Sequence, residues 1–258
     1  MSIEDFEVIS NTQIAKNIWC VTIKCDEVAR KIKPGQFMAV KVPGDKTQLI
    51  RCPFSLSNAN REEGTIEIIY ACVGDATQRM TKWKKGFKSN LIGPLGNGWK
   101  ETDPKEKVLL VAGGVGITPI LGLARYMGQH NIHFDCVVAA RSRDFLAGAS
   151  ECEEAGASSV VVTTDDGSLG IKGFATDGVC ELLKTNTYSK IYCCGPEVCM
   201  ASVAKLAQAN DIACEVSMER MMTCGFGACN TCNVAMAAGG YKACCKAGPV
   251  FDGCEVAW

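Results

Sequence analysis

The sequence predicts an all-β barrel followed by an α/β doubly wound domain, with a small cysteine-rich subdomain at the C-terminus. Three observations carry this prediction. Short β-rich segments separated by turns fill the first part of the chain. A fully apolar strand then runs into a glycine-rich turn and a helix. Closely spaced cysteines and glycines occupy the end of the chain. The expected boundaries are 1–100, 101–212 and 213–258.

The first region should be an antiparallel barrel. Segments rich in β-branched and aromatic residues, bounded by turn signals, are expected as strands at 18–24, 36–42, 50–57 and 65–70. A helix is expected over 77–83. Gly74 and Thr77 at its start, with Arg51 nearby, would offer amides, a hydroxyl and a cation to a phosphate. A solvated Arg51 and a merely capping Thr77 are the plainer interpretation, which these segments favour by themselves.

The second region begins with a strand at 108–112 that is apolar throughout, as in a parallel sheet buried on both faces. It leads through a glycine-rich turn into a helix expected over 120–127. Gly114 and Gly116 would let a pyrophosphate approach the backbone at the helix N-terminus. The G-x-G-x-x-G match is incomplete, because Pro119 stands at the third glycine position. A generic tight turn is the alternative.

Further strands are expected at 133–140, 160–164 and 189–193, with a helix over 197–210. Arg141 and Arg143 follow the first of these and would either meet a 2′-phosphate or face solvent. Ligands of such sheets collect at the carboxyl ends of the strands. Cys194, at the last of these ends, is therefore a candidate to face a nicotinamide. A buried structural thiol is the equally open alternative.

The cysteines of the third region have a distinctive spacing. Cys224, Cys229 and Cys232 follow the pattern C-x4-C-x2-C, and Cys244 and Cys245 come later. This is the plant-type spacing for a [2Fe–2S] cluster held by four thiolates. A zinc site is the rival, although structural zinc sites usually pair two C-x2-4-C units. Glycines at 225 and 227 would provide the positive φ that a chain wrapping a cluster needs.

Composition excludes some function classes. The chain has 258 residues, a formal net charge of −1 and 17 cysteines. A balanced charge gives no electrostatic footprint for nucleic acid or anionic lipid. The acidic N-terminus does not resemble a signal peptide, and no apolar run is long and unbroken enough to span a membrane. We therefore expect a cytoplasmic protein with reduced thiols, and neither nucleic acid nor a membrane as a partner.

Together these motifs resemble the ferredoxin–NADP reductase superfamily, through Arg-x-Pro-x-Ser, Gly-Gly-Val-Gly-Ile-Thr-Pro and Cys-Gly-Pro. The segment Glu-Arg-Met-Met-Thr-Cys-Gly-Phe-Gly-Ala-Cys-Asn-Thr-Cys narrows the resemblance to the electron-transfer subunit (PyrK) family of dihydroorotate dehydrogenase B. Cys52 stands where that family commonly has arginine, and Arg51 lies one residue earlier. The chain also resembles the small subunits of NADH-dependent ferredoxin–NADP oxidoreductases and sulfide dehydrogenases. Those subunits usually have Asp as the first cluster ligand, whereas this chain has Cys224, which favours the dihydroorotate dehydrogenase type.

The resemblance implies three cofactor sites. FAD would be bound by Arg51, Pro53, Phe54, Ser55, Ile69, Tyr70, Ala71, Gly74, Ala76 and Thr77. NAD(H) would be bound by Gly114, Gly116, Thr118 and Gly195, with Cys194 near the nicotinamide. The [2Fe–2S] cluster would be held by Cys224, Cys229, Cys232 and Cys245. The last is chosen because two residues separate the family's fourth cysteine from Gly-Pro-Val-Phe.

The implied function is an electron relay between NAD(H), FAD, the cluster and a partner. The partner would be a catalytic flavoprotein subunit resembling dihydroorotate dehydrogenase, in a heterotetramer with two copies of each chain. Met221, Met222 and Phe226 would form a docking face or, equally, core around the cluster. A subunit serving another flavoprotein and a zinc-binding interaction module remain alternatives. The sequence leaves open NADH versus NADPH, the terminal substrate and the direction of electron flow.

Overall fold

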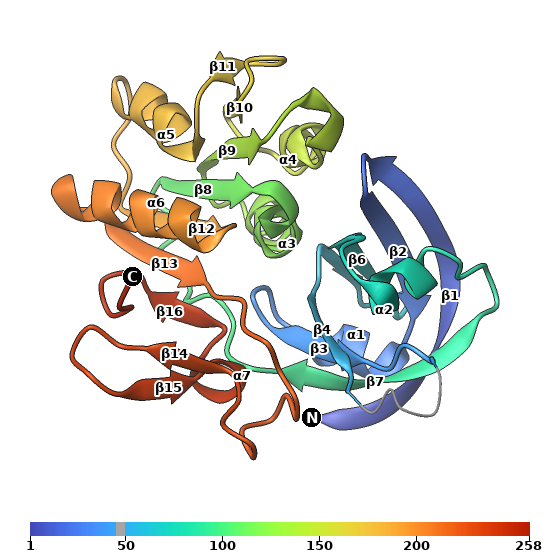
Figure 1. Ribbon diagram of the computed structural model, residues 1–258. Coiled ribbons are helices and arrows are strands. Elements are labelled where there is room, and N and C mark those ends of the chain that lie inside the picture. The colour runs from blue at the N-terminus through green and yellow to red at the C-terminus, as the bar shows by residue number, and fades with distance from the viewer. Residues whose placement is uncertain (45–49) are drawn as a thin grey trace.

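The computed structural model describes residues 1–44 and 50–258. It confirms the predicted fold class. A curved antiparallel sheet, an α/β layer with helices on both faces and a short C-terminal segment lie side by side (Figure 1). None of the helices in the described parts of the chain is both long and apolar enough to cross a membrane.

The barrel sheet has seven antiparallel strands in the order β4-β3-β7-β1-β2-β6-β5. Alternate residues of β2, such as Val21 and Ile23, are buried inside it, as expected for a strand with one face on the core. The strands are β1 (Ser2–Ala15), β2 (Ile18–Lys24), β3 (Phe37–Val40), β4 (Cys52–Ser55), β5 (Asn58–Asn60), β6 (Thr65–Ala71) and β7 (Lys88–Leu95). Two short helices accompany them, α1 (Asp26–Lys31) and α2 (Asp75–Met80).

The second sheet has the order β11-β10-β9-β8-β12-β13-β16 and is parallel except for β16 at its edge. Every residue of β8 and β9 is buried, which explains the continuous apolar run of β8. In β9 the buried Asp135 interrupts the apolar run and pairs with Lys107 at 2.6 Å. The strands are β8 (Val108–Gly113), β9 (Phe134–Ala140), β10 (Val160–Thr164), β11 (Ile171–Lys172), β12 (Lys190–Cys194), β13 (Ala213–Ser217) and β16 (Val250–Asp252).

Helices cover both faces of this sheet. One face packs on α3 (Ile117–Gln129) and α4 (Ala149–Glu154), and the other on α5 (Ala175–Leu183) and α6 (Glu197–Ala209). Two 3-10 turns, η1 (Gly114–Gly116) and η2 (Arg143–Phe145), follow β8 and β9. The chain reverses its direction across the sheet between β8 and β12. The carboxyl ends of these two strands therefore form the crevice where such folds bind ligands.

The C-terminal segment joins both larger regions. It contains the hairpin β14 (Asn233–Ala235) and β15 (Tyr241–Ala243), the short helix α7 (Cys244–Ala247), and β16, which pairs with β13. β13 itself pairs with β12, so residues 213–217 belong to the parallel sheet. On the barrel side, the backbone N–H of Asn97 donates to Gly248 O at 2.7 Å. These contacts hold the C-terminal segment against both sheets.

Helix α3 carries the main contact between barrel and α/β domain. The Thr118 hydroxyl donates to the carbonyl of Ile69 on β6 at 2.8 Å. The Arg125 guanidinium forms an ion pair with Glu67 of β6 at 2.6 Å and donates to Ser57 O at 3.0 Å. Burial tends to raise the pKa of the Glu67 carboxyl, but the bonds and charge of Arg125 outweigh it and hold that pKa below its usual value. The contact fixes α3 on the barrel.

Candidate functional site

Four cysteines of the C-terminal segment come together as two pairs. The thiols of Cys224 and Cys229 interact with each other, and so do those of Cys232 and Cys245. Cys245 also lies close enough to Cys224 for the charge of that thiolate to raise the pKa of Cys245. In residues 1–44 and 50–258, no three His, Cys, Asp or Glu side chains have the geometry of a single-ion site. Two thiol pairs are the donor set of a cluster in which each of two irons takes two thiolates.

Cys244 lies apart from this group. Its thiol is fully buried and donates to Met218 O at 3.4 Å, and burial raises its pKa to about 12. The backbone N–H of its neighbour Cys245 instead donates to the Cys232 sulfur at 3.3 Å. The geometry therefore supports Cys245 as the fourth member of the site.

The loop supplies hydrogen-bond donors to sulfur. The Ala228 N–H donates to the Cys224 sulfur at 3.3 Å, and the Thr231 hydroxyl to the Cys229 sulfur at 3.2 Å. The hydroxyl and amide of Thr231 lower the pKa of Cys229 to about 6. Amides also outweigh the desolvation of Cys224 and lower its pKa. Such donors stabilise thiolates, the form in which cysteine binds metal.

The tight path of this loop depends on glycine. Gly225 and Gly227 have φ of +77° and +89°, as the sequence analysis expected. A Cβ at Gly227 would also lie 3.0 Å from the Lys246 side chain of α7. These conformations let the chain turn between Cys224 and Cys229. Of the three candidate docking residues, Met221 and Phe226 are exposed and Met222 is buried, so the two alternatives each hold for part of the set.

A cleft of about 770 Å³ lies at the carboxyl ends of the parallel strands. Its walls include Gly114 after β8, Arg141 after β9, Asp165 after β10, and Pro196 and Val198 after β12. The barrel contributes 16–18 and 71–73. This is the crevice at which a doubly wound sheet binds a nucleotide. The positive charge of Arg141 favours an anionic ligand in this cleft. Asp165 adds a carboxylate to which a ribose hydroxyl would donate.

The residues expected to meet NAD(H) have different environments. Gly114, at φ +56°, lines the cleft, and a Cβ there would meet no atom within 4 Å. A Cβ at Gly116 would lie 2.3 Å from Cys194 O, and one at Gly195 would lie 3.0 Å from Gly113 Cα. Both glycines thus bring the β8 and β12 turns into close contact. Thr118 is buried on Ile69.

Cys194 is buried at the end of β12. Its thiol is directed toward Ser217 O on β13 at 3.5 Å, and burial, reinforced by the charge of Glu219, raises its pKa well above the ordinary value. Cys199 at the start of α6 lines the nucleotide cleft. Sequence reasoning did not single out Cys199, although a residue in the first turn after a parallel strand is a general candidate for such a wall.

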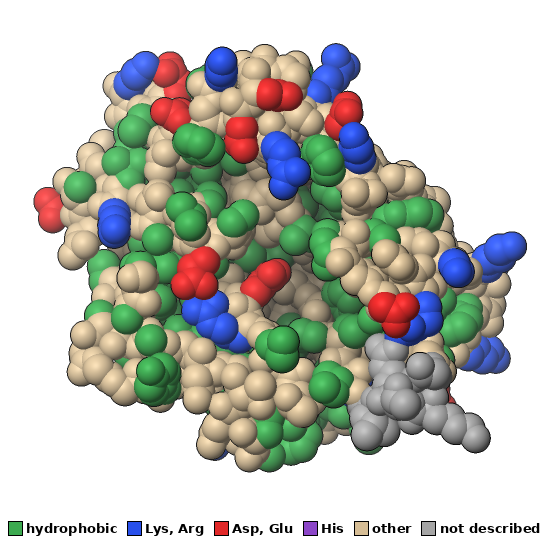
Figure 2. All heavy atoms as spheres, in the orientation of Figure 1, with side chains coloured by type: hydrophobic (Ala, Val, Ile, Leu, Met, Phe, Trp, Pro, Cys, Tyr) green, Lys and Arg blue, Asp and Glu red, His purple; other side chains and the backbone are tan. Residues whose placement is uncertain are grey.

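The residues expected around the flavin lie on β4, on β6 and at α2. Phe54 and Tyr70 pack edge to face with centroids 6.1 Å apart, and the Tyr70 hydroxyl donates to Asn11 inside the barrel. Pro53 is exposed and Ser55 half-buried. The other two predicted flavin residues of β6 face away from Phe54. Ile69 packs toward α3, and Ala71 lines the nucleotide cleft. The face shown in Figure 2 is hollowed at its centre, where the three regions meet, and hydrophobic side chains line much of the hollow.

Two arginines near α2 differ in how fully their guanidinium groups are paired, and Thr77 lies between them in the sequence. The Arg51 guanidinium donates to the carbonyl and side chain of Asn90 on β7, so it ties β4 to its neighbour. The Thr77 hydroxyl caps the helix through Val73 N and Gly74 N, each at 3.0 Å, with half-buried Ala76 beside it. Arg79 pairs with Asp75, yet its buried Nε and Nη2 have no partner among the described residues.

Arg79 is a functional candidate that sequence reasoning missed. It lies close enough to Cys52 to lower that thiol's pKa, which burial raises. Two unpartnered guanidinium nitrogens are what a diphosphate would bind. Arg79 therefore suits the position that Cys52 leaves without a cation. A cation one turn into the helix after the glycine and hydroxyl motif was the signal available in the sequence.

Comparisons with known proteins agree with this geometry. A family model described as the iron–sulfur cluster binding domain of dihydroorotate dehydrogenase B matches residues 219–257. One described as an oxidoreductase NAD-binding domain matches residues 110–205. The chain aligns at TM-score 0.88 and 29% identity, over 98% of its length and 89% of the other, with a chain from an NADH-dependent reduced ferredoxin–NADP oxidoreductase structure. Phthalate dioxygenase reductase, at 19% identity and TM-score 0.67, shares the fold.

Full-length relatives complete the comparison. The chain is 34% identical to the dihydroorotate dehydrogenase B (NAD(+)) electron transfer subunit of Clostridium perfringens, over 99% of both chains. It is 33% identical to that of Fusobacterium nucleatum, again over 99% of both, and 30% identical to that of Desulforamulus reducens over 98% of both. With its nucleotide cleft and its paired thiols, the chain belongs to the family of dihydroorotate dehydrogenase B electron transfer subunits, within the ferredoxin–NADP reductase superfamily.

Proposed function

We propose that this chain is the electron-transfer subunit of a two-component enzyme and passes electrons between NAD(H), FAD and a [2Fe–2S] cluster to or from a catalytic flavoprotein. The observation that carries the proposal is the convergence of four thiols, as two pairs, in the C-terminal segment that contacts both the barrel and the nucleotide-binding sheet. The chemistry that these groups supply when bound is hydride exchange at nicotinamide and flavin and one-electron exchange at the cluster.

The chain's own residues have separate tasks in this proposal. Cys224 and Cys229 would hold one iron, and Cys232 and Cys245 the other. Gly114 and Arg141 would bind the NAD(H) phosphates and adenosine side in the cleft. Arg79 would bind the FAD diphosphate with its unpartnered nitrogens. Residues 1–100, 101–212 and 213–258 remain the proposed FAD, NAD and cluster regions, with β13 shared between the last two.

The ligand positions also suit transfer out of the molecule. Cys229 is exposed, and exposed Met221 and Phe226 flank the Cys224 end of the loop. An apolar exposed surface beside a redox centre is a docking surface for a partner chain. The partner proposed is a dihydroorotate-dehydrogenase-like subunit, in a complex with two copies of each chain. Its active site would determine the terminal substrate.

The test is reconstitution with that partner. The chain, co-expressed with a dihydroorotate-dehydrogenase-like subunit, should co-purify as a complex of four chains and reduce NAD+ with dihydroorotate. Cys232→Ser should remove this activity but leave complex formation and flavin content in place. The proposal fails if the partner does not associate, or if the Cys232→Ser complex reduces NAD+ at the unmodified rate.

A second candidate function has one specific observation in its favour. The structural match at TM-score 0.88 is to a chain of an NADH-dependent reduced ferredoxin–NADP oxidoreductase. In that case the partner would be a flavoprotein that handles NADP and ferredoxin. Reconstitution with each partner separates the two, since dihydroorotate supports NAD+ reduction in only one complex.

A further inference from the structure

A second large pocket lies between the barrel and the α/β domain. Its volume is about 800 Å³, close to that of the nucleotide cleft, and the two share none of their lining residues in the described chain. Helix α3 links them, since Gly114 before its N-terminus lines the cleft, and Gly122, Tyr126 and Gln129 of the helix are among the residues that line the pocket. The proposed electron relay uses no residue of this pocket. Its size falls in the range of small-molecule sites.

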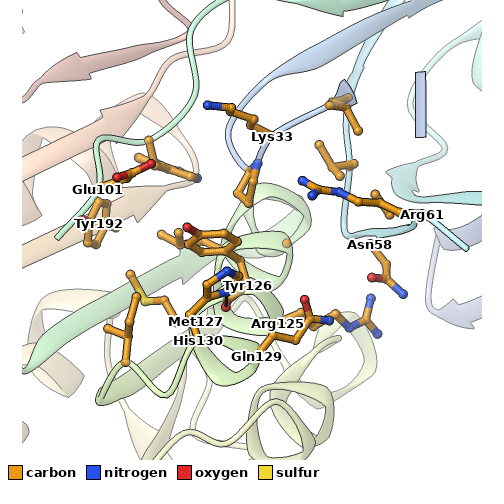
Figure 3. A pocket seen from close by; sticks show the side chains of 18 of the residues that line it. Lys33, Asn58, Arg61, Glu101, Arg125, Tyr126, Met127, Gln129, His130 and Tyr192 are labelled. Atoms are coloured by element: carbon orange, nitrogen blue, oxygen red, sulfur yellow. Dashed lines mark hydrogen bonds between the residues drawn. The ribbon is translucent and has the colours of Figure 1, made fainter. Parts of the chain in front are cut away.

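The charges of this pocket are distributed unevenly. Lys33 and Arg61, both from the barrel, have no carboxylate within 4.0 Å among residues 1–44 and 50–258. Arg125 is already paired with Glu67, and the Lys100 amine lies 3.8 Å from Glu215. In Figure 3, Glu101 lies across the pocket from Arg61, beside Tyr192. Glu62, next to Arg61, reduces the positive charge on that side without pairing with it.

An aromatic pair lies between these two sides. Tyr126 and His130, one turn apart at the end of α3, stack with centroids 4.0 Å apart and an interplanar angle of 28° (Figure 3). His130 Nδ1 lies 2.8 Å from Tyr126 O, a contact in which the nitrogen must be the donor. Nε2 is then left as an acceptor in the neutral ring. Flat aromatic faces with polar edges are suited to stacking a planar heterocycle.

Several polar groups of the wall have no partner. The buried indole N–H of Trp99 has no acceptor within the described residues. The side-chain amides of half-buried Asn58 and exposed Gln129 make no hydrogen bond to the described residues and are open to a ligand or water. Buried polar groups are normally satisfied, so an unpaired N–H in the wall of a cavity points to a ligand or water that pairs with it.

We infer that this pocket binds a nucleoside monophosphate as a second ligand, separate from the nucleotide of the proposed relay. The phosphate would lie at Lys33 and Arg61, the base would stack on the outer face of the Tyr126–His130 pair, and Glu101 would accept from the N–H groups at the far edge of the base. A ligand so placed bridges the barrel and α3. It therefore reinforces the contact that Thr118 and Arg125 already make between the two domains.

The test is calorimetric titration of the full-length protein with UMP and with AMP, with and without saturating NAD+. Inorganic phosphate and uridine serve as the anion-only and base-only probes. Binding of one nucleotide should persist with NAD+ present. The double variant Lys33→Ala with Arg61→Ala should weaken it at least about tenfold, because a cation bonded to phosphate contributes at least that much. Tyr126→Leu should weaken it a few-fold.

Two control variants separate the pocket from the cleft. Arg30→Ala removes an exposed cation of α1 outside the pocket, and Arg141→Ala removes the cation of the nucleotide cleft. With the cleft saturated by NAD+, neither variant should change the affinity of the pocket for UMP or AMP. The inference is overturned if neither nucleotide binds, if NAD+ or Arg141→Ala abolishes binding, if the double variant binds normally, or if phosphate alone binds equally well. Titrations without NAD+ test it even if the proposed relay is wrong.

Discussion

Two cysteine-rich regions of this molecule use the same side chain in opposite ways. In the loop at 224–232, amide and hydroxyl donors surround the sulfurs, and the pKa values of Cys224 and Cys229 are lowered. In the parallel sheet, a hydrogen bond to Cys152 and burial raise the pKa of Cys136. Burial likewise raises that of Cys214 to about 12. The surroundings of the thiols thus separate the proposed metal ligands from the cysteines packed in the sheet.

What distinguishes the two groups of cysteines is whether the backbone brings their thiols together, and not how exposed the thiols are. Cys245 is as buried as the sheet thiols, and burial raises its pKa to about 12, yet it lies against Cys232 and within reach of Cys224. Thiols gathered in this way repel one another once ionised, so only a bound cation favours their shared deprotonation. Sheet cysteines such as Cys193 and Cys194 instead donate to a neighbouring sulfur or carbonyl. Convergence of the thiols, and not their burial, is what supports the proposed ligands.

Removal of a loop thiol should have the largest effect. Cys232→Ser should reduce iron from about two atoms per chain to near zero. It should slow reduction of the partner more than about 100-fold, since even outer contacts of a metal site are worth 10–100-fold. FAD content should be unchanged. Iron analysis and stopped-flow absorbance measure both effects, and a Cys232→Ser protein with full iron would break the division between the two regions.

The adjacent cysteines of α7 give a sharper test. Cys245→Ser should lose the cluster, whereas Cys244→Ser should keep it, because the Cys244 thiol points to Met218 O. Iron content and cluster absorbance of the two variants, purified side by side without oxygen, decide between them. Equal loss in both would assign Cys244 a ligand role and contradict the geometry.

Replacing a thiol of the parallel sheet should lower the stability of the fold and leave the iron content unchanged. Cys136→Ser places a hydroxyl in a fully buried position beside Cys152 and should lower the free energy of unfolding by about 1–3 kcal/mol. The matched exposed change, Cys180→Ser, should cost less than about 0.5 kcal/mol. Denaturant titration measures both. An iron loss in Cys136→Ser with unchanged stability would be contrary to this assignment.

A single donor to sulfur should have the smallest effect. Thr231→Val removes the hydroxyl that donates to Cys229, which favours the more negative, reduced cluster. The midpoint potential should fall by roughly 40 mV, the one-electron equivalent of about 1 kcal/mol. Thr223→Val, which removes only a contact to the Thr231 hydroxyl, should shift it less. A redox titration monitored by electron paramagnetic resonance measures each; an equal shift in both variants would argue against a direct bond to sulfur.

The sequence was most informative where local pattern and structure coincide. Strands at 18–24 and 160–164 were predicted with the observed bounds, because their β-branched runs are bordered by turns. β1 was missed, since its 14 residues are mostly polar and only Phe6 and Val8 are buried. α5 was missed as well. It contains Gly178, where a Cβ would lie 2.7 Å from Val137, so packing on β9 overrides poor helix propensity.

The sites were predictable only in part. The cysteine spacing indicated a four-thiolate site but did not by itself separate Cys245 from Cys244. The resemblance to the family favoured Cys245, and the Cys244 thiol, which points to Met218 O, agrees with that choice. Glycine motifs located the cleft after β8, yet the burial of Thr118 against β6 depends on contacts between domains. The unpartnered nitrogens of Arg79 and the pocket beside Tyr126 arise from elements distant in sequence. No local pattern encodes them.

The most direct measurement is the visible spectrum of the anaerobically purified chain, with iron, zinc and FAD analysis, before and after NADH is added. Our account predicts flavin bands over a broad iron–sulfur absorbance, about two irons per chain, and loss of both absorbances on reduction by NADH. A colourless protein that contains zinc would contradict it. Flavin bands without iron would retain a reductase but remove the cluster from the C-terminal loop.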